Sequence, residues 1–304
     1  MLFIGALILG TLLTGAASRP PSYPTFGGEQ IFIKNNDVTI HYCKYGSGPY
    51  LIFQHGFPDR ETTWNDFQVS EFSKNYTVLT PTLRGFPPSS IPHDVQAYTA
   101  GAYVSDVLAI LAHEHISNIT FIGHDFGGAV AQQLAFNHPD RVNALVILNT
   151  PIIPVFLPLL EHDAEAQNYA RYTLSYYTYE PGQPKNVSTL VENIRNTTYR
   201  AEIAEYLEDS PINGMLNFYK NNYPGPPYGR NLSADEMVQK VPSMLLWGQE
   251  EPYISPKVLD GLEKWFENGL RLVTIPHAGH WVFRDQWRRA NEEIWSFLGI
   301  AGRL

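Results

Sequence analysis

The chain contains few of the residues that link, bind metal or contact nucleic acid. Cys43 is its single cysteine, which excludes an intrachain disulfide, and we interpret it as a small apolar filler on a strand. Lys and Arg number 21 against 30 Asp and Glu, without basic runs. Nucleic-acid binding requires clustered cations, so we predict no nucleic-acid partner. A helical His-x-x-x-His pair and a cysteine cluster are both missing, and we predict no metal site.

Long apolar runs are also scarce. Residues 1–13 are apolar but too few to span a bilayer comfortably, and small residues follow at 14–18. We predict that residues 1–18 are a signal peptide and that the protein is secreted or resides in the secretory-pathway lumen. An uncleaved membrane anchor is the alternative, because the run lacks a preceding Lys or Arg. Five sequons agree with secretion and predict a glycoprotein: Asn75, Asn118, Asn186, Asn196 and Asn231.

What is present is enough for a large folded core. The 304 residues are 44% hydrophobic and 17% charged, which excludes general disorder. Residues 30–34 and 38–43 predict a hairpin around a turn at 35–37. Further strands are predicted at 50–54, 76–80, 119–122, 143–148, 241–247 and 270–275, and helices at 103–113, after 126, at 256–266 and around 287–297. This alternation predicts an α/β fold with a mostly parallel sheet flanked by helices.

The middle of the chain has a different character. Residues 151–240 hold ten of the eighteen tyrosines and several prolines, with helical patterns at 189–194 and 201–207 and no clear buried strand. We call this stretch the lid segment and predict that it is a helical insertion over the sheet. The core then has a first part at 19–150 and a second part at 241–304.

The most informative stretch is 119–130. An apolar strand pattern breaks at Gly123, exposes Asp125, and continues as a helix that begins with Gly127 and Gly128. The glycines have the spacing of a nucleophile elbow, in which small neighbours allow a strained turn to raise one side chain above the sheet edge. The alternative is that Asp125 only caps the helix.

Other chemically useful residues follow other predicted strands. The amide of Phe57, after strand 50–54, is a candidate oxyanion donor, although a plain turn would explain the same residues. Glu250 and Glu251 follow the penultimate strand, and His280 follows the last. Carboxyl ends of parallel strands share one edge of the sheet. The order nucleophile, acid, histidine is that of α/β-hydrolases.

Four motifs resemble those of the epoxide-hydrolase branch of the α/β-hydrolase family: HGFP at 55–58, GHDFGG at 123–128, WGQEE at 247–251 and GHW at 279–281. The resemblance implies Asp125 as nucleophile, His280 as base and Glu251 as the acid that orients it. It also implies oxyanion donors from the amides of Phe57 and Phe126. The family pattern has Asp where this chain has Glu251, and Glu250 remains a competitor for the role.

The chemistry agrees with this resemblance. An ionised aspartate can attack a polarised saturated carbon and form an ester, which water activated by a histidine then cleaves. This scheme requires no metal and no cofactor. An opening epoxide needs a proton donor, and the tyrosine-rich lid segment offers several. Tyr219 matches the second lid tyrosine of the family, and Tyr172, Tyr176 and Tyr177 are candidates for the first.

We therefore predict an epoxide hydrolase acting on a small apolar epoxide. One alternative is a haloalkane or haloacid dehalogenase with the same aspartate, although halide release usually needs tryptophan donors, which the lid segment lacks. The other is an inactive secreted binding protein on the same scaffold. The natural epoxide and the oligomeric state cannot be read from the sequence.

Overall fold

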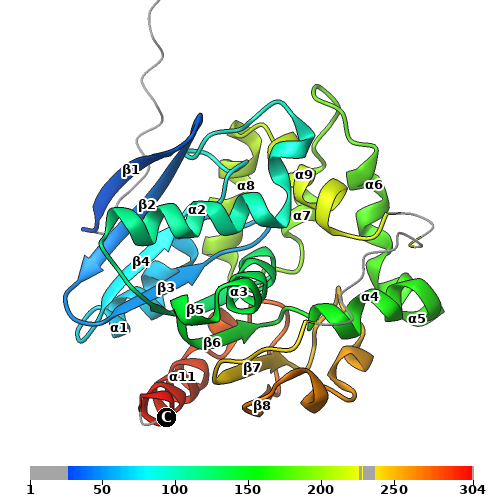
Figure 1. Cartoon of the computed structure of the whole chain (residues 1–304). Helices are drawn as coiled ribbons and strands as arrows, with labels where there is room; N and C mark the ends of the chain where they lie inside the picture. The colour runs from blue at the N-terminus through cyan, green and yellow to red at the C-terminus, as the bar shows by residue number, and fades with distance from the viewer. Residues whose placement is uncertain (1–26, 226–227, 229–236, 303–304) are drawn as a thin grey trace, which may run out of the picture.

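The computed structural model describes residues 27–225, 228 and 237–302 (Figure 1). The predicted signal peptide or anchor at 1–18 and the sequon at Asn231 lie outside these residues. Within them, no helix is both long and apolar enough to cross a membrane. The sequon residues Asn75, Asn118, Asn186 and Asn196 are all exposed. Their glycosylation remains a prediction from the sequence.

An eight-stranded sheet forms the centre of the molecule, in the order β1-β2-β4-β3-β5-β6-β7-β8. The hairpin of β1 and β2 pairs antiparallel, β2 pairs antiparallel with β4, and strands β3 to β8 are parallel. The strands are β1 Glu29–Asn35, β2 Val38–Gly46, β3 Tyr50–Gln54, β4 Thr77–Pro81, β5 Ile119–His124, β6 Val142–Leu148, β7 Ser243–Gly248 and β8 Leu270–Ile275. The predicted fold class is confirmed.

The parallel strands are buried because helices flank the sheet. Every residue of β4, β5 and β7 is buried, as expected of continuous apolar runs covered on both faces. Helix α3 packs against β5 and β6, α2 packs against α3, and α11 contacts β6. The helices outside the lid segment are α1 Ser70–Phe72, α2 Ala100–His113, α3 Phe126–Asn137, α10 Val282–Asp285 and α11 Trp287–Ala301. Cys43, on β2, is buried as predicted.

Short helical turns complete the core. They are η1 Glu61–Trp64, η2 Asn65–Val69, η3 Val95–Tyr98, η4 Pro139–Arg141, η6 Pro256–Leu259 and η7 Glu263–Trp265, of which η2 is a π-helix. The last two replace the continuous helix predicted at 256–266, and that prediction was wrong. Gly261 between them has φ +67°, a left-handed conformation that ends a helix.

Helices are the only regular elements of the lid segment among its described residues before 226. Its helices lie between β6 and β7 in the chain and gather on one side of the sheet (Figure 1). They are α4 Ile153–His162, α5 Ala164–Tyr169, η5 Ala170–Thr173, α6 Leu174–Tyr177, α7 Val187–Val191, α8 Thr197–Asp209 and α9 Asn213–Asn222. The helix predicted at 189–194 thus begins and ends earlier, and the pattern at 201–207 lies inside α8.

Glycines allow α3 to begin directly against the sheet. A Cβ added to Gly127 would lie 2.2 Å from the backbone oxygen of Gln54, and one added to Gly128 would lie 2.1 Å from Oγ1 of Thr150. Both distances are far below van der Waals contact, so any larger residue would push α3 away from β3 or from the segment after β6. This close approach places the start of α3 at the carboxyl edge of the sheet.

We expect Gly127→Ala to destabilise the fold by about 3 kcal/mol, because the added methyl group overpacks a backbone contact. Gly101→Ala is the matched control. Gly101 lies in α2, and a Cβ added there would meet nothing within 4 Å, so that change should stabilise the protein by about 0.5–1 kcal/mol. Urea unfolding of both variants measures the difference. Equal stabilities would contradict the packing argument.

Candidate active site

Asp125 occupies a strained turn between β5 and α3. Its backbone has φ 52° and ψ −118°, a conformation that L-residues rarely adopt. Small neighbours make room for it: a Cβ on Gly56 would lie 2.4 Å from Oδ1 of Asp125, and one on Gly123 would lie 2.3 Å from the carbonyl oxygen of Gly127. The Asp125 side chain accepts no capping hydrogen bond from the second or third residue of α3, which is the bond that an N-cap side chain makes. The helix-capping alternative is therefore wrong, and the elbow geometry predicted from the glycine spacing is present.

Backbone amides hold the Asp125 carboxylate. The Phe57 amide donates to Oδ1 over 2.8 Å, and the Phe126 amide also donates to this carboxylate. Burial raises the pKa of Asp125, while His280 and the two amides act in the opposite direction. The structure thus places both predicted oxyanion donors on the same carboxylate. Oδ1 accepts a hydrogen bond from the Phe57 amide, whereas Oδ2 faces His280.

His280 lies between two carboxylates. Its Nδ1 is 2.7 Å from Oε2 of Glu251, and its Nε2 is 3.7 Å from Oδ2 of Asp125. Burial alone would lower the pKa of His280, but the Glu251 carboxylate and, to a lesser degree, Asp125 raise it to about 9. An imidazole held in this way is oriented by one carboxylate and aimed at the other.

Glu251 rather than Glu250 is next to His280. The side chain of Glu250 is 51% exposed, and its Oε2 lies 2.6 Å from Nη2 of Arg195. Glu251 is buried, and its carboxylate accepts hydrogen bonds from Asn149 Nδ2 at 2.7 Å and from the Tyr253 amide at 2.9 Å. The geometry therefore distinguishes the two glutamates that the sequence could not separate.

Asn149 is a site residue that sequence reasoning missed. It follows β6, and besides donating to Glu251 its Oδ1 accepts from the Gly248 amide at 2.9 Å. It thereby connects the end of β6 to the loop that carries the acid. Its position directly after a buried strand is the signal that could have identified it.

A second buried polar group lies behind the base. The Asp59 carboxylate accepts from Tyr199 Oη at 2.7 Å and from Trp281 Nε1 at 2.9 Å. His124 Nε2 lies 3.0 Å from the carbonyl oxygen of His280, and its Nδ1 is 3.8 Å from Asp59. Burial raises the pKa of Asp59 to about 6. Asp59 follows the HGFP motif and His124 lies within GHDFGG, but their mutual contact arises only from the fold.

A cavity of about 750 Å³ opens above Asp125, between α3, α4 and α9. Most of its lining is apolar, including Val130, Phe156 and Phe218. Among the described residues that line it, Asp125 is the only charged one and none is a tryptophan. The Asp125 side chain is 16% exposed, and Asp125 is one of the residues that line this cavity. The chamber suits a neutral, apolar ligand.

Two of the predicted lid tyrosines line this cavity together with Asp125, namely Tyr172 and Tyr219. Their ring centroids are 6.5 Å apart. Burial raises the pKa of both phenols well above the ordinary value, so both hydroxyls remain protonated and able to donate. Tyr219 also packs edge-on against Phe126, with centroids 4.9 Å apart.

The other two candidates are placed differently. Tyr176 packs against the rings of Phe57 and Tyr219, at 5.7 Å and 5.0 Å, but is not among the cavity-lining residues. Tyr177 directs its hydroxyl to the carbonyl oxygen of Pro224 at 3.1 Å. The structure therefore favours Tyr172 as the partner of Tyr219 and shows Tyr177 engaged elsewhere.

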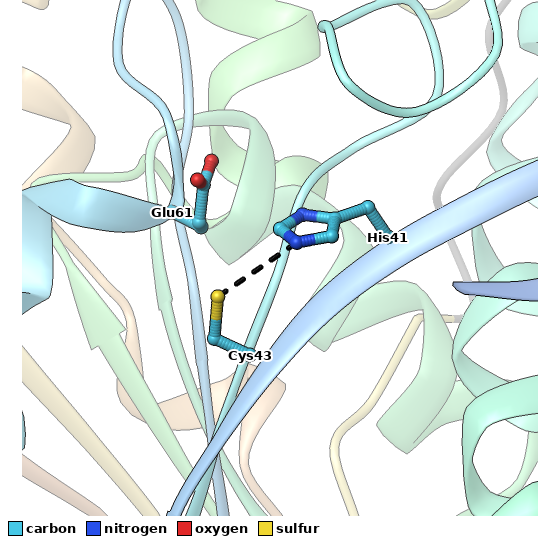
Figure 2. A group of neighbouring side chains, drawn as sticks. All are labelled: His41, Cys43 and Glu61. Carbon is cyan, nitrogen blue, oxygen red and sulfur yellow. Dashed lines mark hydrogen bonds between the residues drawn. The ribbon is translucent and has the colours of Figure 1, made fainter. Parts of the chain in front are cut away.

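One buried group among the described residues has the side chains that bind metals: His41, Cys43 and Glu61, with ligand atoms within 4.8 Å of one another (Figure 2). His41 Nε2 is 3.8 Å from Cys43 Sγ, and its Nδ1 is 2.8 Å from Thr82 Oγ1. The Thr82 hydroxyl donates in turn to Glu61 at 3.0 Å.

Arg60 completes this chain by pairing with the other oxygen of Glu61 at 2.7 Å. The group is best described as a buried hydrogen-bonded chain on β2 and η1. None of its three metal-binding side chains lines the cavity above Asp125.

Known proteins of similar sequence and structure share this architecture. Residues 49–286 match the model of the alpha/beta hydrolase fold family. Epoxide hydrolase 4 of Homo sapiens is 26% identical over 93% of this chain and 83% of its own length, and Epoxide hydrolase 2 of Caenorhabditis elegans is 25% identical over 88% and 79%. A Bacillus megaterium epoxide hydrolase structure superposes with a TM-score of 0.80 at 24% identity, covering 88% of this chain and all of that one.

A Vigna radiata epoxide hydrolase gives a TM-score of 0.69 at 20% identity, over 90% of this chain and 98% of its own. These likenesses agree with the branch that the four motifs resemble. The family model spans well over half of the chain, and the sheet order, the elbow and the strand-end residues are all in place. The chain belongs to the alpha/beta hydrolase fold family.

Proposed function

We propose that the protein is an epoxide hydrolase, which adds water to an oxirane to give a vicinal diol through an ester on Asp125. The observation that carries this proposal is the Asp125 carboxylate itself, held by backbone amides in an apolar cavity that Tyr172 and Tyr219 also line. The relatives and structural neighbours named as epoxide hydrolases support the same reaction.

Ring opening uses the free oxygen of the carboxylate. Oδ1 is bound by the Phe57 amide, so Oδ2 is the oxygen available to attack an oxirane carbon. The new C–O bond forms as the oxirane C–O bond breaks, and the departing oxygen takes a proton from Tyr172 or Tyr219. Their raised pKa keeps the phenols protonated until a more basic alkoxide forms.

Hydrolysis of the ester then uses the other half of the site. Water between His280 and the ester loses a proton to Nε2 and attacks the carboxyl carbon of Asp125. The Phe57 and Phe126 amides stabilise the oxyanion, and Glu251 stabilises the imidazolium. The tetrahedral intermediate then collapses, and the departing diol oxygen takes the proton from the His280 imidazolium. The carboxylic acid formed on Asp125 returns a proton to the tyrosinate, which restores both the free carboxylate and the phenol.

The charge on Asp125 links the two steps. Asp125 helps to raise the pKa of His280 in the free enzyme. Once the carboxylate becomes a neutral ester, this contribution disappears and the imidazole loses its proton more readily. His280 therefore becomes able to accept a proton from water once the ester on Asp125 has formed.

The cavity favours an oxirane over a haloalkane. A leaving halide needs N–H donors, and no tryptophan is among the described residues that line the cavity. Trp281, the nearest in sequence to His280, donates its indole N–H to Asp59. The tyrosines supply O–H donors, which match the proton demand of an alkoxide.

Rapid-quench mass spectrometry with styrene oxide tests the ester directly. We expect a covalent adduct on the peptide that contains Asp125, and none in Asp125→Ala. His280→Gln should accumulate the adduct stoichiometrically, because ring opening does not need the base while hydrolysis slows by about 10²–10⁴-fold. The proposal fails if a broad epoxide panel yields neither adduct nor diol.

Tyrosine substitutions test the proton donors. We expect Tyr172→Phe and Tyr219→Phe each to slow ring opening, and the double variant to lose about a hundredfold or more. Tyr177→Phe is the control, because its hydroxyl bonds to Pro224 and should be dispensable. Pre-steady-state burst rates report the opening step. A large loss in Tyr176→Phe but not in Tyr172→Phe would show that the pair is wrongly assigned.

The titration of His280 tests the electrostatics. Nuclear magnetic resonance should show a His280 pKa of about 9. Glu251→Gln should lower that pKa, because the charge that opposes the effect of burial is then removed. A folded-state pKa above the ordinary 6.5 stabilises the protein fully below pH 6.5, and this stabilisation is lost as the pH rises through about 9. Urea unfolding of wild type and His280→Gln should therefore converge at high pH. A wild-type pKa at or below 6.5 would contradict this account.

A further inference from the structure

Arg195 connects the lid segment to both loops that carry the acid and the base. It lies between α7 and α8, and its guanidinium reaches across to the core. Nη1 donates to the carbonyl oxygen of His277 at 2.9 Å, and Nη2 pairs with Glu250 at 2.6 Å. One side chain of the lid segment thus contacts the loop after β8 and the loop after β7.

A third contact of Arg195 also holds the loop that carries His280. Arg195 Nε lies 3.4 Å from Oδ2 of Asp285, and the same oxygen accepts from the Gly279 amide at 2.8 Å. The carbonyl of His277 and the amide of Gly279 are therefore held by the two members of one ion pair. His280 follows Gly279 directly, so its position depends on these contacts.

The loop needs such support because its backbone is unusual. His277 has φ 59°, a left-handed conformation that is unfavourable for a residue with a side chain. The Asp285 side chain is only 7% exposed, whereas the side chains of Arg195 and Glu250 are 43% and 51% exposed. Solvent therefore screens the Arg195–Glu250 pair more than the Arg195–Asp285 contact, and we expect the Asp285 contact to matter more of the two.

A neighbouring contact reinforces the same connection. Asn193 Nδ2 donates to the Tyr253 hydroxyl at 3.0 Å, and the Tyr253 amide donates to Glu251 at 2.9 Å. The Tyr253 ring also packs edge-on against His280, with centroids 5.2 Å apart. Two side chains of the lid segment, Asn193 and Arg195, therefore contact the loops that carry Glu251 and His280.

We propose that Arg195 is a positioning residue, which sets the distance between His280 and the ester on Asp125 by holding the loop at 277–280 against the lid segment. It touches no reacting atom. This proposal rests on the proposed epoxide hydrolysis for its kinetic consequence, and on geometry alone for its effect on His280. His280 Nε2 is 3.7 Å from Oδ2 of Asp125 and must activate the water that attacks the ester, so a small loop shift changes the hydrolytic step more than the opening step.

The kinetic test compares Arg195→Ala with Arg195→Lys and with Arg200→Ala. Arg200 is a matched control, because it lies on α8 and donates to the Glu192 carbonyl within the lid segment. We expect Arg195→Ala to slow ester hydrolysis by about tenfold or more while the opening rate changes much less, so that the aspartyl ester accumulates. Arg195→Lys should restore only part of the rate, since an ammonium lacks the planar fork.

A second readout does not depend on turnover. The proton on His280 Nδ1, bonded to Glu251, gives a downfield resonance that reports the geometry of this contact. We expect that resonance to shift or broaden in Arg195→Ala and to be unchanged in Arg200→Ala, with melting temperatures compared to detect general unfolding. If no epoxide is turned over, the resonance alone decides the proposal. An unchanged resonance, or equal loss of opening and hydrolysis, overturns it.

Discussion

The strained turn at Asp125 is the constraint on which the rest of the site depends. Its positive φ raises the carboxylate above the edge of the sheet, and Gly56 and Gly123 leave the space that this turn requires. The strain is unfavourable in isolation. Parallel pairing of β5 with β3 and β6, and the tight seating of α3, hold the turn in place. A buried framework thus keeps one carboxylate exposed to a cavity.

Electrostatics divides the carboxylates of the site into different roles. Asp125 and Glu251 both act on His280, but Glu251 is bonded to Asn149 and to the Tyr253 amide, while Asp125 has one oxygen directed to the cavity. The first is fixed and the second is free to react. Buried phenols with raised pKa line the cavity beside Asp125. In the proposed reaction these phenols donate a proton, and His280, which faces Oδ2 of Asp125, removes one.

Local patterns were sufficient to predict much of this arrangement. Apolar runs predicted the strands, because a strand that is buried on both faces consists almost entirely of apolar residues. The spacing of Gly123 and Gly127 predicted the elbow. The helix expected at 256–266 was wrong because Gly261 in a left-handed conformation divides it. The choice between Glu250 and Glu251 could not be made either. Adjacent residues leave a loop in different directions, and only the fold shows which one meets His280.

The contacts that escaped prediction join residues far apart in the sequence. Asn149, Asp59 and Arg195 carry ordinary polar side chains. The places of Asn149 after β6 and of Asp59 after the HGFP motif are local signals, but they do not show which distant residues these side chains contact. Each becomes informative only when a distant strand end or helix is placed beside it. Of the three, Arg195 has the widest implication. The lid segment that contributes Tyr172 and Tyr219 to ring opening also reaches the loop of His280, so its seating on the core bears on both halves of the proposed reaction. A lid attached in this way aligns the proton donors with the base, since displacing it would disturb both.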